Sequence, residues 1–268
     1  MTFEHQVVWL TGASSGIGEA LVPRLVARGA RVAISARRAD RLEAIAGAAR
    51  ARGGDVRPFP LDVTDRDATR ATVAAIERAF GAIDVAILNA GSHLRPAVQP
   101  FDAQQYLDTF ALNVFGALYG IEAVLPGMLA RRRGWIVGIS SLAGYRAVPT
   151  AGAYGSSKAA FSHILDALRF DLEPHGVRVV SVTPGFIKTP LTDRNRFRMP
   201  FLMPVDAAAD RIIRGIERER REIHFPKPFS WTLKLLRVLP YPVYDRIIRR
   251  ATADRQRLQK LEHPGTGV

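Results

Sequence analysis

The sequence of 268 residues contains no cysteine. This absence excludes disulfide bonds, thiolate metal sites and cysteine nucleophiles. The six histidines show no ligand-like spacing with carboxylates, so we expect no metal site. No uncharged apolar run approaches the ~18 residues that a membrane span needs. The N-terminus also lacks a basic segment ahead of an apolar one. We therefore expect a cytoplasmic protein without a cleaved signal peptide.

Acidic residues are few relative to basic ones: 38 Lys and Arg stand against 25 Asp and Glu, for a net charge of +13. The excess lies mostly in the last third of the chain. Much of it is Arg dispersed among acidic neighbours, as in RGIERERREI, without the basic platform interleaved with aromatics that is typical of nucleic-acid binding. We interpret it as a solvated face and expect no nucleic-acid partner. Phosphate-bearing cofactors and anionic lipid headgroups stay open as milder partners.

The hydrophobic content of 47% allows a substantial core, and its pattern alternates along the chain. Short β-rich runs predict strands at 6–10, 31–35, 56–60, 84–88, 134–140 and 177–183. The stretches between them predict helices at 16–28, 39–52, 66–79, 103–131 and 153–173. Such alternation is typical of an α/β fold with a doubly wound, Rossmann-like parallel sheet. A helix at 206–221 and the short strand EIHFP complete a single domain, residues 1–225. Residues 226–268 are expected to form a basic, amphipathic C-terminal helical appendix.

A glycine-rich turn, TGASSGIGEAL, follows the first predicted strand directly. Gly12, Gly16 and Gly18 open a helix there, and glycine allows both positive φ and close approach of a ligand. The unpaired N–H groups of a helix N-terminus attract phosphate, and Ser14 and Ser15 add hydroxyl groups. The turn therefore predicts a phosphate-binding site. The alternative is an ordinary tight turn.

The end of the second strand indicates which dinucleotide is bound. An acid there binds a ribose 2′-hydroxyl, whereas an arginine suits a 2′-phosphate. The sequence is SARRAD, which places Arg37 and Arg38 where an acid is expected. We therefore expect NADP(H) rather than NAD(H). The alternative is that both arginines are solvated and that Asp40 reaches the ribose.

Polar residues with chemical potential follow later strands and one helix. Tyr154 and Lys158 in AYGSSKAAF lie four positions apart, on one face of a helix. Ser141 closes the fifth strand, and LNAG closes the fourth, where Asn89 and Gly91 can bring an amide and bare backbone against a cofactor. Asn113 is expected mid-helix, a poor place for asparagine unless it has a special role.

Together these motifs resemble the short-chain dehydrogenase/reductase family over residues 5–190. The matching elements are TGASSGIG, LDV, NAG, Asn113, Ser141, YGSSK and PGFIKT. The resemblance implies an oxidoreductase acting on an alcohol/carbonyl pair, with Asn113, Ser141, Tyr154 and Lys158 as the catalytic tetrad. The cofactor-binding residues expected from the motifs are Gly12, Ser14, Ser15, Gly16, Ile17, Gly18, Arg37, Arg38, Asp62, Val63, Asn89, Ala90, Gly91, Tyr154, Lys158, Pro184, Gly185, Ile187 and Thr189.

The chemistry of carbonyl reduction explains these residue types. A phenol with an ordinary pKa of about 10 is a slow proton donor at neutral pH. We expect the Lys158 cation to lower the pKa of Tyr154, Ser141 to donate to the carbonyl oxygen, and Asn113 to hold a water molecule. The competing interpretation is a dinucleotide-binding sensor or scaffold without turnover.

The remaining segments bear on substrate and partners. The loop after the sixth strand is apolar, with Phe186, Leu191, Phe197, Met199, Phe201, Leu202 and Met203. This favours a hydrophobic substrate, unless the loop only packs on the tail. Residues 227–250 combine aromatics with Lys and Arg, which suits either peripheral membrane contact or a cap over the active site. His93 is a weaker candidate for the edge of the substrate cleft. The family resemblance implies a homo-oligomer formed through 103–131 and 153–173.

Overall fold

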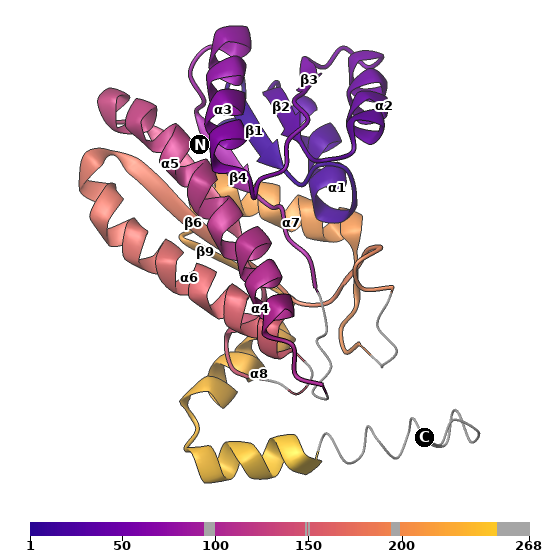
Figure 1. The fold of residues 1–268 in the computed structure, drawn as a ribbon, viewed down its shortest axis with the longest axis vertical. Coiled ribbons are helices and arrows are strands. Elements are labelled where there is room, and N and C mark those ends of the chain that lie inside the picture. The colour runs from indigo at the N-terminus through magenta and orange to yellow at the C-terminus, as the bar shows by residue number, and fades with distance from the viewer. Residues whose placement is uncertain (94–99, 148, 150, 194–198, 251–268) are drawn as a thin grey trace.

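A computed structural model describes residues 1–93, 100–147, 149, 151–193 and 199–250. Its centre is a seven-stranded parallel sheet (Figure 1). In sheet order the strands are β3 (Val56–Pro58), β2 (Arg31–Ser35), β1 (Val7–Thr11), β4 (Val85–Leu88), β5 (Gly134–Ile139), β6 (Val177–Pro184) and β9 (Glu222–Phe225). The chain runs outward from β1 to β3, returns to β4 beside β1, and then runs outward in the other direction. This confirms the predicted doubly wound fold and puts the switch point between β1 and β4.

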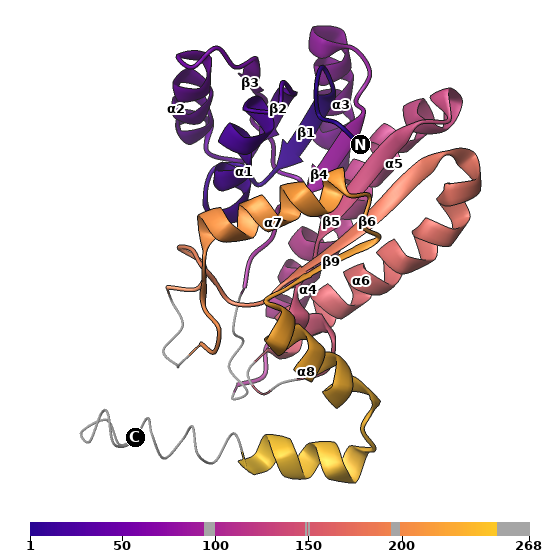
Figure 2. The same ribbon diagram turned by 180° about the vertical axis from the view of Figure 1, so that it is seen from behind.

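Helices cover both faces of the sheet (Figures 1 and 2). One face carries α1 (Gly16–Val26), α2 (Ala39–Arg50) and α7 (Val205–Glu217). The other carries α3 (Arg66–Phe80), α5 (Gly116–Arg131) and α6 (Gly152–Leu172). The short turns η2 (Leu142–Gly144) and η3 (Glu173–His175) flank α6.

The apolar strands supply both halves of the core because side chains alternate along a strand. In β1, Val8 and Leu10 pack under α1, α2 and α7, whereas Val7 and Trp9 pack on the opposite side. All five residues of β1 are buried. A strand buried on both faces reads as a continuous apolar run, which is why the sequence located it.

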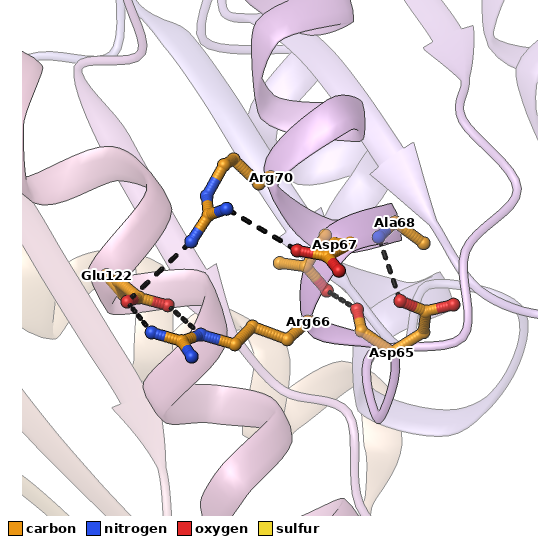
Figure 3. Close-up of polar contacts among 7 residues, drawn as sticks. Asp65, Arg66, Asp67, Ala68, Arg70 and Glu122 are labelled. Carbon is orange, nitrogen blue, oxygen red and sulfur yellow. Dashed lines mark hydrogen bonds and ion pairs between the residues drawn. The ribbon is translucent and has the colours of Figure 1, made fainter.

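Figure 3 shows Arg66 and Arg70, near the start of α3, facing Glu122 of α5. Asp65 caps α3 by accepting a 2.9 Å hydrogen bond from the Ala68 N–H. Two nitrogens of Arg66 donate hydrogen bonds to the Glu122 carboxylate of α5, one of them at 2.8 Å. At the start of α5, a Cβ on Gly116 would lie 2.8 Å from Val63. These contacts set the position of α5 against the loop that follows β3.

The long helix predicted at 103–131 is interrupted. It consists of α4 (Ala103–Phe110), the π turn η1 (Ala111–Phe115) and α5. Among the described residues this stretch, 103–131, is the one helix long and apolar enough to cross a membrane. Its apolar residues have a different use here, because Ile121, Val124 and Met128 of α5 are buried in the core. We assign this stretch to the packed domain.

The C-terminal third contains a small sheet that the sequence did not predict. A small sheet pairs β7 (Ile187–Lys188) with β8 (Met203–Pro204), closing the apolar loop at its base. The appendix begins with α8 (Lys227–Val238), followed by a second helical stretch at 241–250. α8 ends at Val238, two residues before Pro240, which lacks the N–H that would continue the hydrogen-bond ladder. Figure 1 shows the chain turning between the two helical stretches.

Candidate active site

A cleft of about 540 Å³ opens at the carboxyl ends of the strands, where a doubly wound sheet binds its ligands. Every predicted tetrad and cofactor residue lines it except Gly18 and Asn113. The lining residues are Gly12, Ser14, Ser15, Gly16, Ile17, Arg37, Arg38, Asp62, Val63, Asn89, Ala90, Gly91, Ser141, Tyr154, Lys158, Pro184, Gly185, Ile187 and Thr189. The structure thus brings together segments that lie far apart in the sequence.

The glycine-rich turn has a backbone that only glycine adopts readily. Gly12 and Gly16 have φ values of +66° and +59°. A Cβ on Gly12 would lie 2.8 Å from the Ala90 backbone, so β1 and β4 approach too closely there for a side chain. Ser15 is the N-cap residue of α1 in extended conformation, without a side-chain cap bond. The first N–H groups of α1 are therefore available to a phosphate.

Gly18 has a packing role. A Cβ there would lie 2.3 Å from the Gly12 carbonyl oxygen and 2.7 Å from the Asn89 amide nitrogen. It lies outside the cleft lining, contrary to our expectation of cofactor contact. Asn89 lines the cleft, and its amide also donates to the Thr11 and Gly12 carbonyls at 3.1 Å each. Asn89 thus ties the turn to β4.

The two arginines after β2 differ in their contacts. Arg38 donates to the carbonyl oxygen and the hydroxyl of Ser14, at 2.9 and 3.0 Å. Arg37 is exposed and makes no such bond with a described residue, but its charge contributes to lowering the pKa of Asp62. That pKa is lowered mainly by hydrogen bonds from Thr64, against burial, which acts to raise it. Asp40, the alternative ribose ligand, does not line the cleft.

Tyr154 and Ser141 meet through close packing of two short elements. Ser141 is the N-cap of η2, and its Oγ accepts a 3.1 Å hydrogen bond from the Ala143 N–H. Its hydroxyl hydrogen is then available to the Tyr154 oxygen, and the Ser141 side chain acts to lower the pKa of Tyr154. A Cβ on Gly144 would lie 2.8 Å from the backbone of α6. Glycine there lets η2 approach the helix that carries Tyr154.

Lys158 is buried, with 4% of its surface exposed, and its Nζ donates to the Ile139 carbonyl at 2.9 Å. Its Nζ lies 6.0 Å from the centre of the Tyr154 ring. Burial lowers the pKa of Lys158 to about 8. The pKa of Tyr154 is raised, because burial outweighs the hydrogen bond from Ser141. The expectation that Lys158 lowers the pKa of Tyr154 is therefore wrong for this chain.

Asn113 lies in the π turn η1, a form of helix that is often found at functional sites. Its Oδ1 accepts from the Ser92 N–H at 2.9 Å. Its Nδ2 donates to the Ser92 carbonyl and to the Ser157 hydroxyl, both at 3.0 Å. Both amide hydrogens are thus used within the protein. Asn113 lies directly behind Gly91, which lines the cleft: a Cβ added to Gly91 would lie 3.0 Å from the Asn113 Oδ1.

Some cleft residues were not anticipated from the motifs. Ser140 fixes α6 to β5, since its Oγ donates to the Lys158 carbonyl at 2.9 Å. Thr192 holds the turn after β7, donating to the Ile187 carbonyl at 2.6 Å. Neither residue belongs to a spacing pattern. His93, an uncertain candidate from the sequence, packs its ring against Tyr154 with centroids 4.5 Å apart.

The apolar loop and the appendix meet at one end of the cleft. Phe229 of α8 stacks on Phe186 and Phe201, with centroid distances of 5.8 and 6.0 Å. Phe229 lies directly behind the lining, because a Cβ on Gly185 would approach it to 3.3 Å. Phe197 lies outside the described residues, and Met203 is buried at the base of the loop. The loop therefore packs on the tail while Leu191 lines the cleft.

The appendix is fixed to the domain by polar contacts near the cleft. Arg146 lies between Ser141 and Tyr154 in the sequence and donates to the carbonyls of Leu236 and Leu239, at 2.6 and 2.7 Å. In β9, Glu222 accepts hydrogen bonds from Tyr145 and Lys234, both at 2.5 Å. Burial and this carboxylate raise the pKa of Tyr145. The segment after Phe225 thus packs on the sheet edge that ends in β9.

The described residues include no group of three His, Asp or Glu side chains that could hold a metal ion. What the cleft fits is a dinucleotide: it has bare backbone and helix N–H groups at one end and Ser141, Tyr154 and Lys158 at the other.

Comparisons with known proteins agree with this geometry. The family model for short chain dehydrogenases matches residues 6–199. An uncharacterized oxidoreductase of Myxococcus xanthus is 39% identical over 92% of this chain and 97% of its own length. The structure of actinorhodin polyketide ketoreductase with NADPH is 27% identical, with a TM-score of 0.74 over 82% of this chain and 94% of that one. A short chain dehydrogenase/reductase of Burkholderia phymatum in complex with NAD is 24% identical, with a TM-score of 0.80 over 88% and 94% of the two chains, and shares the fold. This chain belongs to the short-chain dehydrogenase/reductase family of oxidoreductases.

Proposed function

We propose that this protein is an NADP(H)-dependent oxidoreductase that interconverts an alcohol and a ketone or aldehyde, with Tyr154 as general acid and base. The observation that carries the proposal is the placement of Tyr154 and Ser141 in the same cleft as the glycine-rich turn. The two ends of one cleft thus provide a phosphate site and a proton donor.

The residues divide the work of carbonyl reduction between them. When bound, NADPH supplies the hydride to the carbonyl carbon. Tyr154 gives its phenolic proton to the carbonyl oxygen, and its raised pKa keeps it protonated at neutral pH. Ser141 donates to the oxygen on which charge develops. Lys158 holds its ammonium at the Ile139 carbonyl, with Nζ 6.0 Å from the centre of the Tyr154 ring.

The preference for NADP(H) rests on Arg37 and Arg38, which both line the cleft where Asp40 does not. Guanidinium groups suit the dianionic 2′-phosphate of NADP(H) and have nothing to neutralise in NAD(H). The solved relatives include complexes with NADPH and with NAD, so the arginines carry this part of the proposal.

We propose a hydrophobic substrate because the loop after β6 and Phe229 form an apolar wall behind Gly185. The test is a screen that follows NADPH absorbance across steroid, retinoid, aliphatic and sugar carbonyls, with the Tyr154→Phe protein as the blank. We expect turnover with the apolar compounds. A strict preference for small polar carbonyls contradicts the substrate class, and absence of turnover in the whole panel favours the sensor or scaffold function.

We propose peripheral membrane contact by the appendix, on an otherwise cytoplasmic protein. Trp231, Leu235, Val238, Tyr241, Val243 and Ile247 are exposed there beside Lys and Arg side chains. Sedimentation with anionic liposomes tests this, comparing the full chain with Leu235→Ser/Val238→Ser. Equal sedimentation of the two proteins argues against membrane contact.

We also propose a homo-oligomer. Leu107, Phe115 and Phe170 are exposed on α4, η1 and α6, the segments expected to associate. Analytical ultracentrifugation of Phe170→Ser against the wild type measures the contribution of this face. A wild-type protein that sediments as a monomer at micromolar concentration contradicts the proposal.

A further inference from the structure

A second groove, of about 260 Å³, lies between α7, β9 and the start of α8, and it shares no lining residue with the cofactor cleft. Figure 2 shows α7 lying across one face of the sheet. The chain passes from α7 through β9 to α8, which begins at the end of that strand. The groove is lined by Arg211, Arg214, Arg218, Arg220, His224 and Lys227, and by no acidic residue.

The charge of this groove follows from how α7 uses its two polar sides. Its carboxylates turn toward α1, where Asp206 and Asp210 pair with Arg24 and Glu217 pairs with Arg28. Arg211 and Arg214 of α7 and its C-cap residue Arg218 repeat at three- and four-residue spacing and so share one face. That face borders the groove.

Within the described residues, the groove cations form no ion pair with an acidic side chain. Arg211, Arg214, Arg218 and Arg220 form no ion pair with any residue in the described part of the chain. The nearest carboxylate of β9, Glu222, is held by Tyr145 and Lys234. A favourable interaction with the C-terminal dipole of α7 accounts for cations in its last turn, such as Arg214 and Arg218. It does not account for Arg220 and Lys227, which lie outside that helix turn.

Lys227 is fixed in place at the rim of the groove. Its Nζ donates to Nε2 of His224 at 3.0 Å, and Nδ1 of the same buried ring bonds the Ser230 hydroxyl at 2.7 Å. The pKa of Lys227 is lowered, first by burial and then by repulsion from Arg220. A cation held by a hydrogen bond among like charges is set up to receive an anion.

We propose that this groove binds a small ligand with two or more phosphate groups. Arginine presents a planar fork that matches phosphate oxygens, and four arginines line this groove. The volume is about half that of the cofactor cleft, which suits a compact polyphosphate better than a second dinucleotide. In this proposal, part of the positive charge that was interpreted from the sequence as a solvated face has a binding role.

The test is calorimetric titration of inorganic pyrophosphate into the protein saturated with NADPH, so that the cofactor cleft is not the site measured. The test variant is Arg211→Gln/Arg214→Gln. The control is Arg52→Gln/Arg78→Gln, which removes the same amount of charge. Arg52 follows the end of α2 and Arg78 lies in α3; both are exposed and form no ion pair with a described residue. We expect a single site in the wild type, at least a tenfold loss of affinity in the test variant, and less than a twofold change in the control.

The melting temperature without pyrophosphate supplies a second readout that a merely structural role would not give. Removing like charges relieves repulsion, so the test variant should melt at a higher temperature than the control variant. Equal losses of affinity in both variants overturn the proposal, since they would report net charge alone. Lower stability with unchanged affinity in the test variant does so too. Tighter binding to anionic lipid vesicles or to duplex DNA, without competition by pyrophosphate, would assign the groove to those partners and also overturn it.

Discussion

The exposed guanidinium of Arg37 provides the sharpest test of cofactor preference. It lines the cleft and makes no ion pair with a described residue, so its removal disturbs little of the fold. A hydrogen bond between charged groups contributes about 1.5–3 kcal/mol. Solvent screening at an exposed site puts the value near the lower end, and about 1.4 kcal/mol corresponds to a tenfold change in Kd. Arg37→Ala should therefore weaken NADPH about tenfold and leave NADH nearly unchanged.

Arg38 provides the contrast, because it also holds the glycine-rich turn through two hydrogen bonds to Ser14. Arg38→Ala should weaken both cofactors, since that turn binds the phosphates that they share. Asp40→Ala should change neither, because Asp40 does not line the cleft.

The assay is titration of each cofactor followed by quenching of tryptophan fluorescence, at low and high salt. The selectivity for NADPH should diminish as salt screens the arginines. Equal losses for NADPH and NADH in Arg37→Ala refute the 2′-phosphate assignment. A loss of NADH binding in Asp40→Ala supports the ribose alternative.

Three further predictions concern the catalytic end and the turn. Tyr154→Phe should lower kcat ~10²–10⁴-fold with the Kd of NADPH unchanged, and near-normal turnover measured by NADPH absorbance contradicts the proton-transfer role. The pKa of Lys158 is lower in the folded state than in the unfolded chain, so the unfolded chain binds more protons between about pH 8 and 10.5. The free energy of unfolding should therefore rise with pH in that window, by about 3 kcal/mol relative to Lys158→Met in urea titrations. If the wild type and Lys158→Met show the same pH dependence, burial does not lower the pKa of Lys158. Gly18→Ala should destabilise the fold by at least ~1–3 kcal/mol and weaken cofactor binding, because its Cβ meets the Gly12 backbone. The matched control Gly47→Ala, whose Cβ meets no described atom within 4 Å, should stabilise α2 by about 0.5–1 kcal/mol, and equal effects at both positions in thermal melts would contradict the packing role.

The sequence determined the features that depend on neighbours along the chain. Strand runs are apolar because both faces of the sheet are covered, and the alternation with helices predicted the doubly wound order. The positive φ of Gly12 and Gly16 follows from a tight turn between a strand and a helix. The four-residue spacing of Tyr154 and Lys158 put both on one helix face.

Tertiary structure alone decided what those residues meet. Gly18 packs on Gly12, and Asn89 bonds the same turn from another strand, which no local pattern reveals. The pKa of Tyr154 moves upward because burial depends on the whole fold and outweighs one hydrogen bond. The arginines of α7 looked dispersed among acids in the sequence, yet the carboxylates pair with α1 and leave the cations together in one groove. Charges that alternate along a helix are separated in space when its faces meet different neighbours.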